Sequence, residues 1–541
     1  APGSSTTRYN DVVISDLSFA KWPEVVADDQ KPVSQLVPLI RAATDVSLSA
    51  MTMQFVETTF SEDGVSMVQT YGPVLIGPTV NGDISTVVAS GFAMSVSEDG
   101  ESDPLFEATA AALNIRDYNY GTTLEALLKG PQDDAPYEVS VGAMEAADIS
   151  VSVPEENLDL SIERVAFDDI GVRTPSIDLL ATVDRFALAE INDGPEPSEQ
   201  EIIELVGSIY GSLSLGRFAV EGVAASGDEI EKLELGSFVI ADLSAAGLGE
   251  ISVNGLDVEG QNGEIIKTER YALEGFTFPP LAALVGLEEA VERQDVPAIL
   301  EGLPKFDRIV QNGIRIVVPE ENADIEIGSS LFEMLDHIGP IPTGIRMGLD
   351  GLRLSVESLE PEDREPFEAL GLETVVASAD TLIKWDRETT DINIDLLASV
   401  EQLGTLSGEG TIGSVPAIVF EQPNQSTAFA LLGATFKNLT LRFDDDGVVE
   451  RGIAVAAEEE GIGYDAMELR LKGLVPVIAA ELDDVELAAE IANAVTAVID
   501  NGAAISLRIA ASTPLPIVAL NGALNNPASI PQLFDIEVAN P

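Results

Sequence analysis

Histidine and cysteine, the side chains that most often do chemistry near neutral pH, are almost absent from this chain of 541 residues. The chain has no cysteine and one histidine, His337. Histidine is the usual general base, cysteine is the most ready nucleophile, and together they supply most transition-metal sites. The commonest catalytic and metal-site designs are therefore not available, and the sequence predicts a protein that is not an enzyme and has no resident cofactor. No catalytic or cofactor-binding residue is assigned.

One glycine-rich segment matches a nucleotide-binding pattern. Residues 408–413 read Gly-Glu-Gly-Thr-Ile-Gly, which is the spacing GxGxxG. That fingerprint requires a following helix whose N-terminus receives the pyrophosphate. Residues 414–420 instead suggest a strand interrupted by Pro416, and Glu409 would repel phosphate. The segment is therefore not interpreted as a nucleotide site.

Acidic residues offer weaker candidates for chemistry. Residues 444–447 read Asp-Asp-Asp-Gly and resemble part of a calcium loop, but the first ligand position of that loop would be Arg442. A single calcium ion is possible there or at Asp168 and Asp169, and a solvated turn is the alternative. Paired carboxylates could serve glycoside or protease chemistry, but nothing among 93 acidic residues selects one pair.

The charge of the chain excludes several partners. With 93 acidic and 28 basic residues the net charge is -65, which disfavours nucleic acids and anionic membrane surfaces because both are bound through Lys and Arg. Despite this charge, 45% of the residues are apolar and the mean hydropathy is +0.18, so a large apolar interior is expected. No apolar run reaches the roughly 18 residues of a membrane span.

The first residues suggest export. The chain begins Ala-Pro-Gly-Ser-Ser without a methionine, which we interpret as the mature end left after removal of a signal peptide. The predicted location is the periplasm or the extracellular space, and the high acidity suits a salty medium.

An internal duplication is the strongest sign of domain organisation. Residues 153–160 (VPEENLDL) recur 165 positions later as residues 318–325 (VPEENADI), with alternating apolar residues on both sides. Alternation of this kind predicts half-buried strands, so each Pro-Glu-Glu-Asn segment should be a hairpin loop. His337 occupies the slot that an aspartate fills in the first copy, which predicts a surface loop position without a catalytic role.

A weaker pattern has about half that period. Strand-like starts near residues 92, 186, 276, 352 and 439 are each followed by a polar loop and a short helix. The predicted segments include a strand at 92–96, a helix at 105–114, a strand at 186–188, a helix at 200–210, helices at 281–293 and 366–372, and a strand and helix at 439–443 and 453–460. Such units usually cannot bury their apolar faces alone, so neighbours must stack along an axis.

The C-terminal end is distinct from the repeats. Asp483 and Asp484 can cap a helix, and Gly502 can end it before a strand at 505–510. One apolar stripe of that helix comprises Leu487, Ile491, Val495 and Val498. A second turn and strand at 531–538 close the chain.

Part of the C-terminal third resembles known sequences. The segments are 383–386 (IKWD), 391–396 (DINIDL), 403–408 (LGTLSG) and 439–451 (LTLRFDDDGVVER). They resemble uncharacterised exported proteins of alphaproteobacteria, which are distantly similar to the YdgA-like and AsmA-like envelope proteins. The resemblance implies a periplasmic repeat of curved β-sheet, with an apolar trough for lipid in some relatives.

These observations predict an α+β, β-rich fold: an elongated array of repeated, curved antiparallel sheet units with short amphipathic helices. The expected divisions are an N-terminal segment (1–45), a first repeat unit (46–135), two long copies (136–300 and 301–465) and a helix-strand cap (466–541). The predicted function is binding or conduction of a lipid or other hydrophobic ligand in an apolar trough of the sheet. The alternative is a structural or assembly component of the cell envelope that has no ligand and associates with itself or with an envelope protein.

Overall fold

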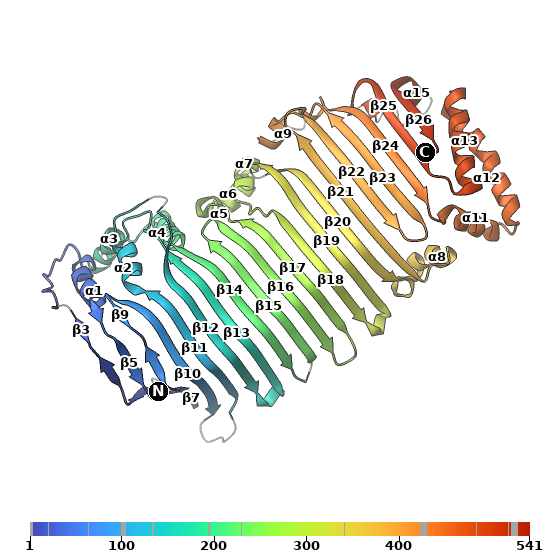
Figure 1. The fold of residues 1–541 in the computed structure, drawn as a ribbon. Helices are drawn as coiled ribbons and strands as arrows, with labels where there is room; N and C mark the ends of the chain where they lie inside the picture. The colour runs from blue at the N-terminus through green and yellow to red at the C-terminus, as the bar shows by residue number, and fades with distance from the viewer. Residues whose placement is uncertain are drawn as a thin grey trace. The chain divides into compact units, whose positions relative to one another are not determined.

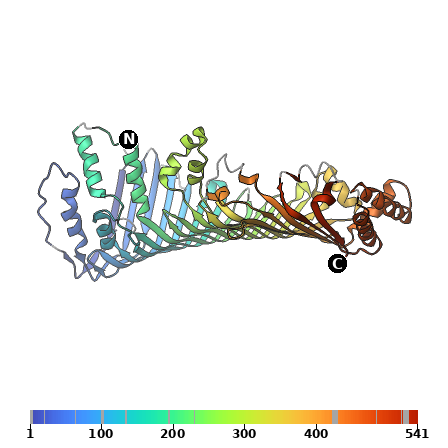
Figure 2. The same cartoon turned by 90° about the horizontal axis from the view of Figure 1, so that it is seen from above.

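The fold was analysed in a computed structural model (Figures 1 and 2). The structure describes residues 4–541 except 20, 63, 99–103, 133–134, 193–194, 229, 340, 422–429, 483, 518 and 521–528. The chain is strand-rich, its strands pair antiparallel, and it divides into two compact units. Unit 1 comprises residues 1–261 and 272–285, and unit 2 comprises 262–271 and 286–541. The β-rich antiparallel character predicted from the sequence is confirmed.

Unit 1 is a meander of long strands. From β10 to β16 each strand pairs antiparallel with the next, and β10 also pairs with β7, β8 and β9. At the N-terminal side β1 pairs with β6, β2 with β5, and β3 with β4. The strands are β1 (Ser4–Asn10), β2 (Val13–Ser15), β3 (Ser18–Phe19), β4 (Val46–Ser47), β5 (Ala50–Met53), β6 (Phe55–Glu62), β7 (Val65–Tyr71), β8 (Val74–Ile76), β9 (Thr79–Val80), β10 (Asp83–Glu98), β11 (Phe106–Asn119), β12 (Glu138–Val153), β13 (Leu158–Val172), β14 (Leu213–Ser226), β15 (Ile230–Ser244) and β16 (Gly247–Gly260).

The helices of unit 1 gather at one end of these strands (Figure 1). They are α1 (Val37–Thr44), α2 (Tyr120–Leu128), α3 (Leu179–Ile191), α4 (Glu199–Gly211) and α5 (Leu281–Val285). The start of α4 has a complete capping box, in which Ser198 and Glu201 each accept a hydrogen bond from the backbone of the other. Seen from above, α3 and α4 rise from one side of the sheet at that end (Figure 2).

Unit 2 is a second meander, in which β18 to β26 each pair with the next strand. Strand β17 (Ile265–Thr277) spans the division between the two units. The other strands are β18 (Arg308–Val318), β19 (Ala323–Ile338), β20 (Ile341–Ser355), β21 (Thr374–Asp386), β22 (Asp391–Val400), β23 (Gly404–Gly413), β24 (Thr435–Asp445), β25 (Ile505–Pro516) and β26 (Phe534–Ala539). The helices are α6 (Leu287–Arg293), α7 (Val296–Glu301), α8 (Pro361–Ala369), α9 (Ile418–Glu421), α11 (Val448–Glu459), α12 (Tyr464–Ala479), α13 (Val485–Asn501) and α15 (Ile530–Leu533).

Both Pro-Glu-Glu-Asn segments are hairpin loops, as the sequence predicts. The first joins β12 to β13 as a single 3₁₀ turn over Pro154–Glu156, and the second joins β18 to β19 over Pro319–Glu321. Each turn ends on an asparagine in the left-handed conformation, with φ of 47° at Asn157 and 52° at Asn322. Asparagine tolerates this region better than most residues because its short polar side chain can bond locally.

Several helix and strand predictions based on the shorter pattern are wrong. The segment at 105–114, expected to be helical, lies mostly in strand β11, and the segment at 186–188, expected to be a strand, lies inside helix α3. The helix expected at 281–293 is two helices separated at Gly286, and the one expected at 366–372 begins earlier, as α8. The helices expected at 200–210 and 453–460 are present as α4 and α11.

The predicted C-terminal helix is confirmed as α13. Asp484 caps it by accepting hydrogen bonds from the backbone N–H groups of Glu486 and Leu487, and Gly502 ends it with φ of 60°. The stripe expected on this helix includes Leu487 and Val498, which are both buried. The other proposed cap, Asp483, lies outside the described residues.

Left-handed residues recur across the long strands. Each strand from β10 to β16 has one left-handed residue in its interior, with φ between 51° and 84°, and it is either aspartate or glycine. Gly247, the first residue of β16, also has a positive φ, of 155°. The interior left-handed residues form two lines across the sheet, which we call row A and row B. Row A comprises Asp117, Asp169 and Asp242 on β11, β13 and β15, and row B comprises Gly91, Asp148, Gly222 and Gly255 on β10, β12, β14 and β16.

Burial shows that the long strands are not the inner layer of a thick core. The accessible surface is 30359 Å², whereas a compact monomer of 57.1 kDa would expose about 19,000 Å². The largest side chains that are fully buried in the described residues are only those of Val172, Val415 and Pro175, followed by two serines. Leucine, isoleucine and phenylalanine normally fill that class. Much of the sheet therefore has no covering layer.

Candidate functional site

The candidate site is one face of the unit 1 sheet, where four lines of apolar side chains cross the strands. Each line takes one residue from each of the seven strands β10 to β16, and every one of the 28 residues is apolar. We call these lines the apolar rows. Their members, in strand order, are Met94, Ala108, Val151, Leu160, Ala225, Leu233 and Val258; Phe92, Ala110, Ile149, Ile162, Val223, Leu235 and Leu256; Ala89, Leu113, Ala146, Val165, Val220, Phe238 and Val253; and Val87, Ile115, Met144, Phe167, Phe218, Ile240 and Ile251.

The spacing of the apolar rows depends on the left-handed residues. Along β13 the apolar positions are Leu160, Ile162, Val165 and Phe167, so two steps of two residues flank one step of three. The other six strands have the same steps. The step of three coincides with row B, whose left-handed residues interrupt the pleat in alternate strands. Such an irregularity re-aims the side chains that follow, and on this ground we assign all four rows to one face.

Aromatic contacts agree with this arrangement. The rings of Phe167 and Phe218 lie 4.7 Å apart within one row, and Phe238 of the adjacent row lies 6.2 Å from Phe218. These are contact distances for aromatic pairs. The two rows on this side of row B therefore share a face.

The opposite face of the same strands carries the charges. Arg164 forms ion pairs with Glu145 at 3.2 Å and Glu221 at 3.3 Å, and Arg217 forms ion pairs with Glu221 at 2.7 Å and Asp168 at 3.7 Å. A hydrogen bond from Asn114 and the neighbouring Arg164 lower the pKa of Glu145, and Arg217 together with Arg164 lowers the pKa of Glu221. These carboxylates stay ionised and hydrated, so this face is the one that suits water.

The apolar rows are only half-buried. Three alanines among the 28 residues, Ala89, Ala108 and Ala110, are buried, and every larger side chain in the rows keeps part of its surface exposed. Burial is deeper near the helices, where Val141 and Val172 are 8% and 1% exposed. The helices therefore cover the apolar face at one end of the strands and leave the four rows half-buried.

Unit 2 has a similar but less uniform face. One line runs through Ile309, Phe332, Met347, Thr381, Leu396, Gly408, Leu441, Leu507 and Val538. Polar residues interrupt this side, because Thr381 lies in the line and Ser330 donates a hydrogen bond to Gln311 at 2.8 Å in the neighbouring one. Beyond these lines Trp385 packs with Val415 and Ala434 in a small buried cluster. The uninterrupted rows of unit 1 are therefore the stronger candidate.

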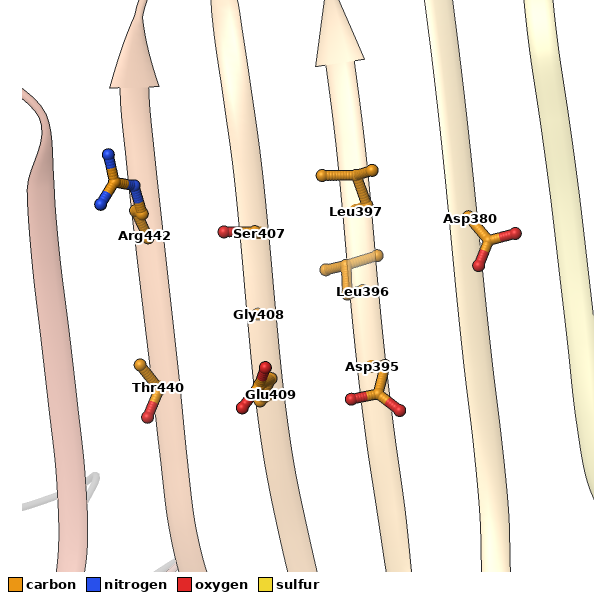
Figure 3. A pocket seen from close by; sticks show the side chains of 9 residues that line it. All are labelled: Asp380, Asp395, Leu396, Leu397, Ser407, Gly408, Glu409, Thr440 and Arg442. Atoms are coloured by element: carbon orange, nitrogen blue, oxygen red, sulfur yellow. The ribbon is translucent and has the colours of Figure 1, made fainter.

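A hollow of about 330 Å³ opens on strands β21 to β24 of unit 2 (Figure 3). Asp395 and Glu409 lie directly across from each other there, and both are exposed. Two other charged members are neutralised, because Asp380 pairs with Arg346 at 3.1 Å and Arg442 pairs with Asp444 at 2.6 Å. Across the described residues, no group of three potential metal ligands comes together. The hollow does not provide a metal site.

The structure places the other sequence candidates on ordinary elements. The glycine-rich segment 408–413 lies within strand β23, so it offers no helix N-terminus to a pyrophosphate. The strand expected over 414–420 is wrong, because this segment is a loop that leads into the short helix α9. Asp445 accepts a hydrogen bond from the N–H of Val449 at the start of α11, and Asp444 is held by Arg442. The Asp-Asp-Asp-Gly segment thus ends a strand and begins a helix.

The surface loop expected for His337 is wrong. His337 lies near the end of strand β19 and pairs with Pro342 of β20. Its ring is half-buried, and Nε2 has no hydrogen-bond partner in the described residues. The aspartates proposed as a calcium site, Asp168 and Asp169, also lie in a strand, where Asp168 faces Arg217 and Asp169 is left-handed.

Comparisons with known proteins cover only the end of the chain. A family model described as an uncharacterized protein matches residues 398–541. No curated protein and no solved structure matches the chain. Among the described residues, no helix is both long and apolar enough to cross a membrane.

Proposed function

We propose that this chain is a non-enzymatic, exported envelope protein that binds or conducts a lipid or similar hydrophobic ligand on the apolar rows of its sheet. The observation that carries the proposal is that 28 consecutive row positions on seven strands contain no polar or charged side chain. The face of an antiparallel sheet that meets only water is normally lined by polar residues, with the apolar residues on the other face. A wholly apolar face therefore points to something other than water that covers it.

The size of the face supports a ligand. Seven strands spaced by roughly 4.8 Å span about 29 Å, and the seven residue steps between the outer rows span about 23 Å. The projected area is then on the order of 650 Å². Monomeric soluble proteins rarely expose a continuous apolar patch larger than a few hundred Å², and larger ones normally mark an interaction site. Several extended acyl chains would fit on it.

A lipid suits this face better than a second copy of the chain. Stacking two such sheets would bury both faces, but each copy carries a net charge of -65, and self-repulsion of that size favours monomers. A slender uncharged hydrocarbon chain covers the rows without adding charge. Self-association in an envelope assembly without a ligand remains the alternative function, and its sign would be a dimer that excludes lipid probes.

The proposal includes repeated, curved units. It is supported by the matched hairpins at Asn157 and Asn322 and by the recurrence of row A and row B across alternate strands. Bulge-like interruptions bend a strand and increase its twist, so regular rows of them would curve the whole sheet. The resemblance of the C-terminal third to exported proteins distantly similar to YdgA-like and AsmA-like proteins supports location in the periplasm or outside the cell.

The direct test is to detect a bound lipid and then to introduce charged residues into the apolar rows that would bind it. Protein purified from its native source should release lipid on organic extraction, detectable by mass spectrometry, and should bind a fluorescent fatty-acid probe. Replacing the paired row residues by Ile162→Glu and Val223→Glu should weaken probe binding at least tenfold, because a charge would then lie in the bound hydrocarbon.

A matched control exists one residue away. Ser161 and Ala224 pair with each other on the opposite face of the same two strands, so Ser161→Glu with Ala224→Glu adds the same charges without touching the apolar rows. This control should bind the probe like the parent chain. Equal loss in both variants, or clean extracts together with no probe binding, would refute the proposal and favour the structural alternative.

A further inference from the structure

We infer that the apolar face of unit 1 selects lipids without net negative charge, because the residues bordering it are overwhelmingly carboxylates. This inference rests on the proposed function and adds the class of lipid. The inference depends on three features of the charge around the rows: the strands are acidic, their basic residues lie on the opposite face, and the hairpin end carries carboxylates.

The seven strands that carry the apolar rows are strongly acidic. Strands β10 to β16 contain 18 Asp and Glu residues and four basic residues, Arg116, Arg164, Arg217 and Lys232. None of the 22 charged residues belongs to an apolar row. A hydrocarbon lying along one of the rows therefore contacts no charged row member, and the headgroup meets a surrounding negative potential.

The basic residues are not available to an anionic headgroup. Arg164 and Arg217 are held by carboxylates on the opposite face, and Lys232 pairs with Glu234 at 3.0 Å and Asp257 at 3.1 Å. Arg116 lies on that face too, in line with Asp168, and its charge contributes to lowering the pKa of Glu145. No basic residue of these strands lies on the face that would receive the lipid.

The hairpin end of the rows is also acidic. A cavity of about 540 Å³ at this end is lined by Glu155, Glu156, Leu158, Gly227, Asp228 and Ile230. Leu158 continues the apolar sequence of β13 past Leu160, so the cavity adjoins the rows. A headgroup that reaches this rim meets three carboxylates, which would repel a phosphate monoanion and tolerate an ammonium group or an uncharged headgroup.

The selectivity should depend on salt. Interactions between exposed charges act over a Debye length of roughly 30 Å at 0.01 M salt but only about 3 Å at 1 M. Discrimination against anionic lipid should therefore be strong at low ionic strength and nearly vanish at high ionic strength. A selectivity based on the shape of the headgroup would not change in this way.

The experiment measures binding of three fluorescent diacyl lipids with identical chains to the full-length protein. The lipids are an uncharged diacylglycerol, zwitterionic phosphatidylcholine and anionic phosphatidylglycerol, each at 0.01 M and 1 M sodium chloride. We expect the anionic lipid to bind at least tenfold more weakly than the other two at low salt, and within threefold of them at high salt. Equal or tighter binding of the anionic lipid at low salt would overturn the inference alone. Failure of all three lipids to bind would overturn the proposed function as well.

Charge reversal at the rim locates the effect. Glu155→Lys with Glu156→Lys changes two exposed hairpin residues. At 0.01 M salt this variant should reduce the ratio of affinities for uncharged and anionic lipid at least threefold. The matched control is Glu190→Lys with Glu204→Lys, which alters the charge equally on exposed positions of helices α3 and α4. The control should change this affinity ratio much less than the hairpin variant does. An equal reduction of the ratio by both variants would overturn the role of the hairpin rim.

Discussion

Asp169 on β13 and Gly216 on β14 lie across from each other, and the ladder between the two strands skips both. Asp169 is left-handed, with φ of 53°. A Cβ atom added to Gly216 would lie 2.9 Å from the Cβ of Asp169. The same relation holds between Asp117 and Gly142, at 3.0 Å. The glycine therefore leaves room for the left-handed aspartate on the neighbouring strand, and the two positions depend on each other.

This dependence predicts a measurable coupling. Gly216→Ala should lower the free energy of unfolding by about 1–3 kcal/mol, the usual range for overpacking. Adding Asp169→Gly removes the side chain that the new methyl group meets. The double variant should therefore lose less free energy of unfolding than the two single variants lose together. Denaturant unfolding of the four proteins in the cycle measures the coupling.

The control is Gly452→Ala within helix α11, where an added Cβ meets nothing within 4 Å. Alanine is favoured over glycine inside a helix by about 0.5–1 kcal/mol, so this change should stabilise the protein. Strict additivity of Asp169→Gly and Gly216→Ala would show that the two residues do not constrain each other.

Local sequence signals were sufficient for some elements. The turns at Asn157 and Asn322 follow from proline, asparagine and the alternation on either side, and α13 follows from Asp484, Gly502 and an apolar stripe. Each set of signals lies within a single turn or a single helix. The alanine-rich segment 105–114 has the local preference of a helix but lies mostly in strand β11, because pairing with β10 and β12 overrides the preference of alanine.

The apolar rows have a signal in the sequence, but it is not the alternation that is typical of strands. Their signal is a spacing of two, three and two residues, as in Leu233, Leu235, Phe238 and Ile240 of β15. A search for strict alternation breaks at every step of three, where row B interrupts the pleat. Which strands align side by side cannot be read from local patterns, because the register is set by pairing between segments distant in the chain.

A second prediction concerns Asp184, which is only 6% exposed in helix α3. It accepts hydrogen bonds from the backbone N–H groups of Val33 at 2.7 Å and Ser34 at 2.9 Å, and from the Ser34 hydroxyl. Burial alone would raise the pKa of Asp184, but these hydrogen bonds and the charge of Lys31 lower it overall. The ionised carboxylate therefore ties the N-terminal segment to α3.

Because its pKa is lowered in the folded state, Asp184 stabilises the protein above the unfolded pKa of about 3.9, and this stabilisation is lost as the pH falls through the folded value. Asp184→Asn should lower the free energy of unfolding by about 1–3 kcal/mol at pH 7, and the deficit should shrink below pH 4. Urea unfolding across pH 3–7 tests this. Glu190→Gln, an exposed change on the same helix, should show no such deficit, and a deficit of Asp184→Asn independent of pH would contradict the assignment.

The two tryptophans should differ in fluorescence. Trp385 is 3% exposed, its indole N–H donates to the carbonyl of Val415 at 2.9 Å, and its ring lies 4.8 Å from Phe420. Trp22 is 57% exposed. Trp22→Phe should leave blue-shifted emission that acrylamide quenches poorly, and Trp385→Phe should leave red-shifted, readily quenched emission. Similar spectra for the two variants would contradict the burial of Trp385.

The last prediction concerns repulsion between like charges. Asp395 and Glu409 are exposed and lie directly across from each other on β22 and β23, an arrangement that destabilises a sheet. Glu409→Gln should therefore raise the free energy of unfolding by about 0.2–1 kcal/mol at 0.01 M salt.

The gain from Glu409→Gln should fade at 1 M salt, where the Debye length is only about 3 Å. The melting temperature of the parent chain should rise over the same range, because 93 acidic residues oppose 28 basic ones and salt screens their repulsion. Glu326→Gln is the contrasting variant, since Glu326 lies near Arg315 at 3.5 Å and Arg353 at 3.6 Å. It should lose stability at low salt, because it removes attraction instead of repulsion. The prediction fails if Glu409→Gln does not change stability at low salt and the melting temperature of the parent chain does not change with salt. In that case nearby positive charges already neutralise the carboxylates of this sheet.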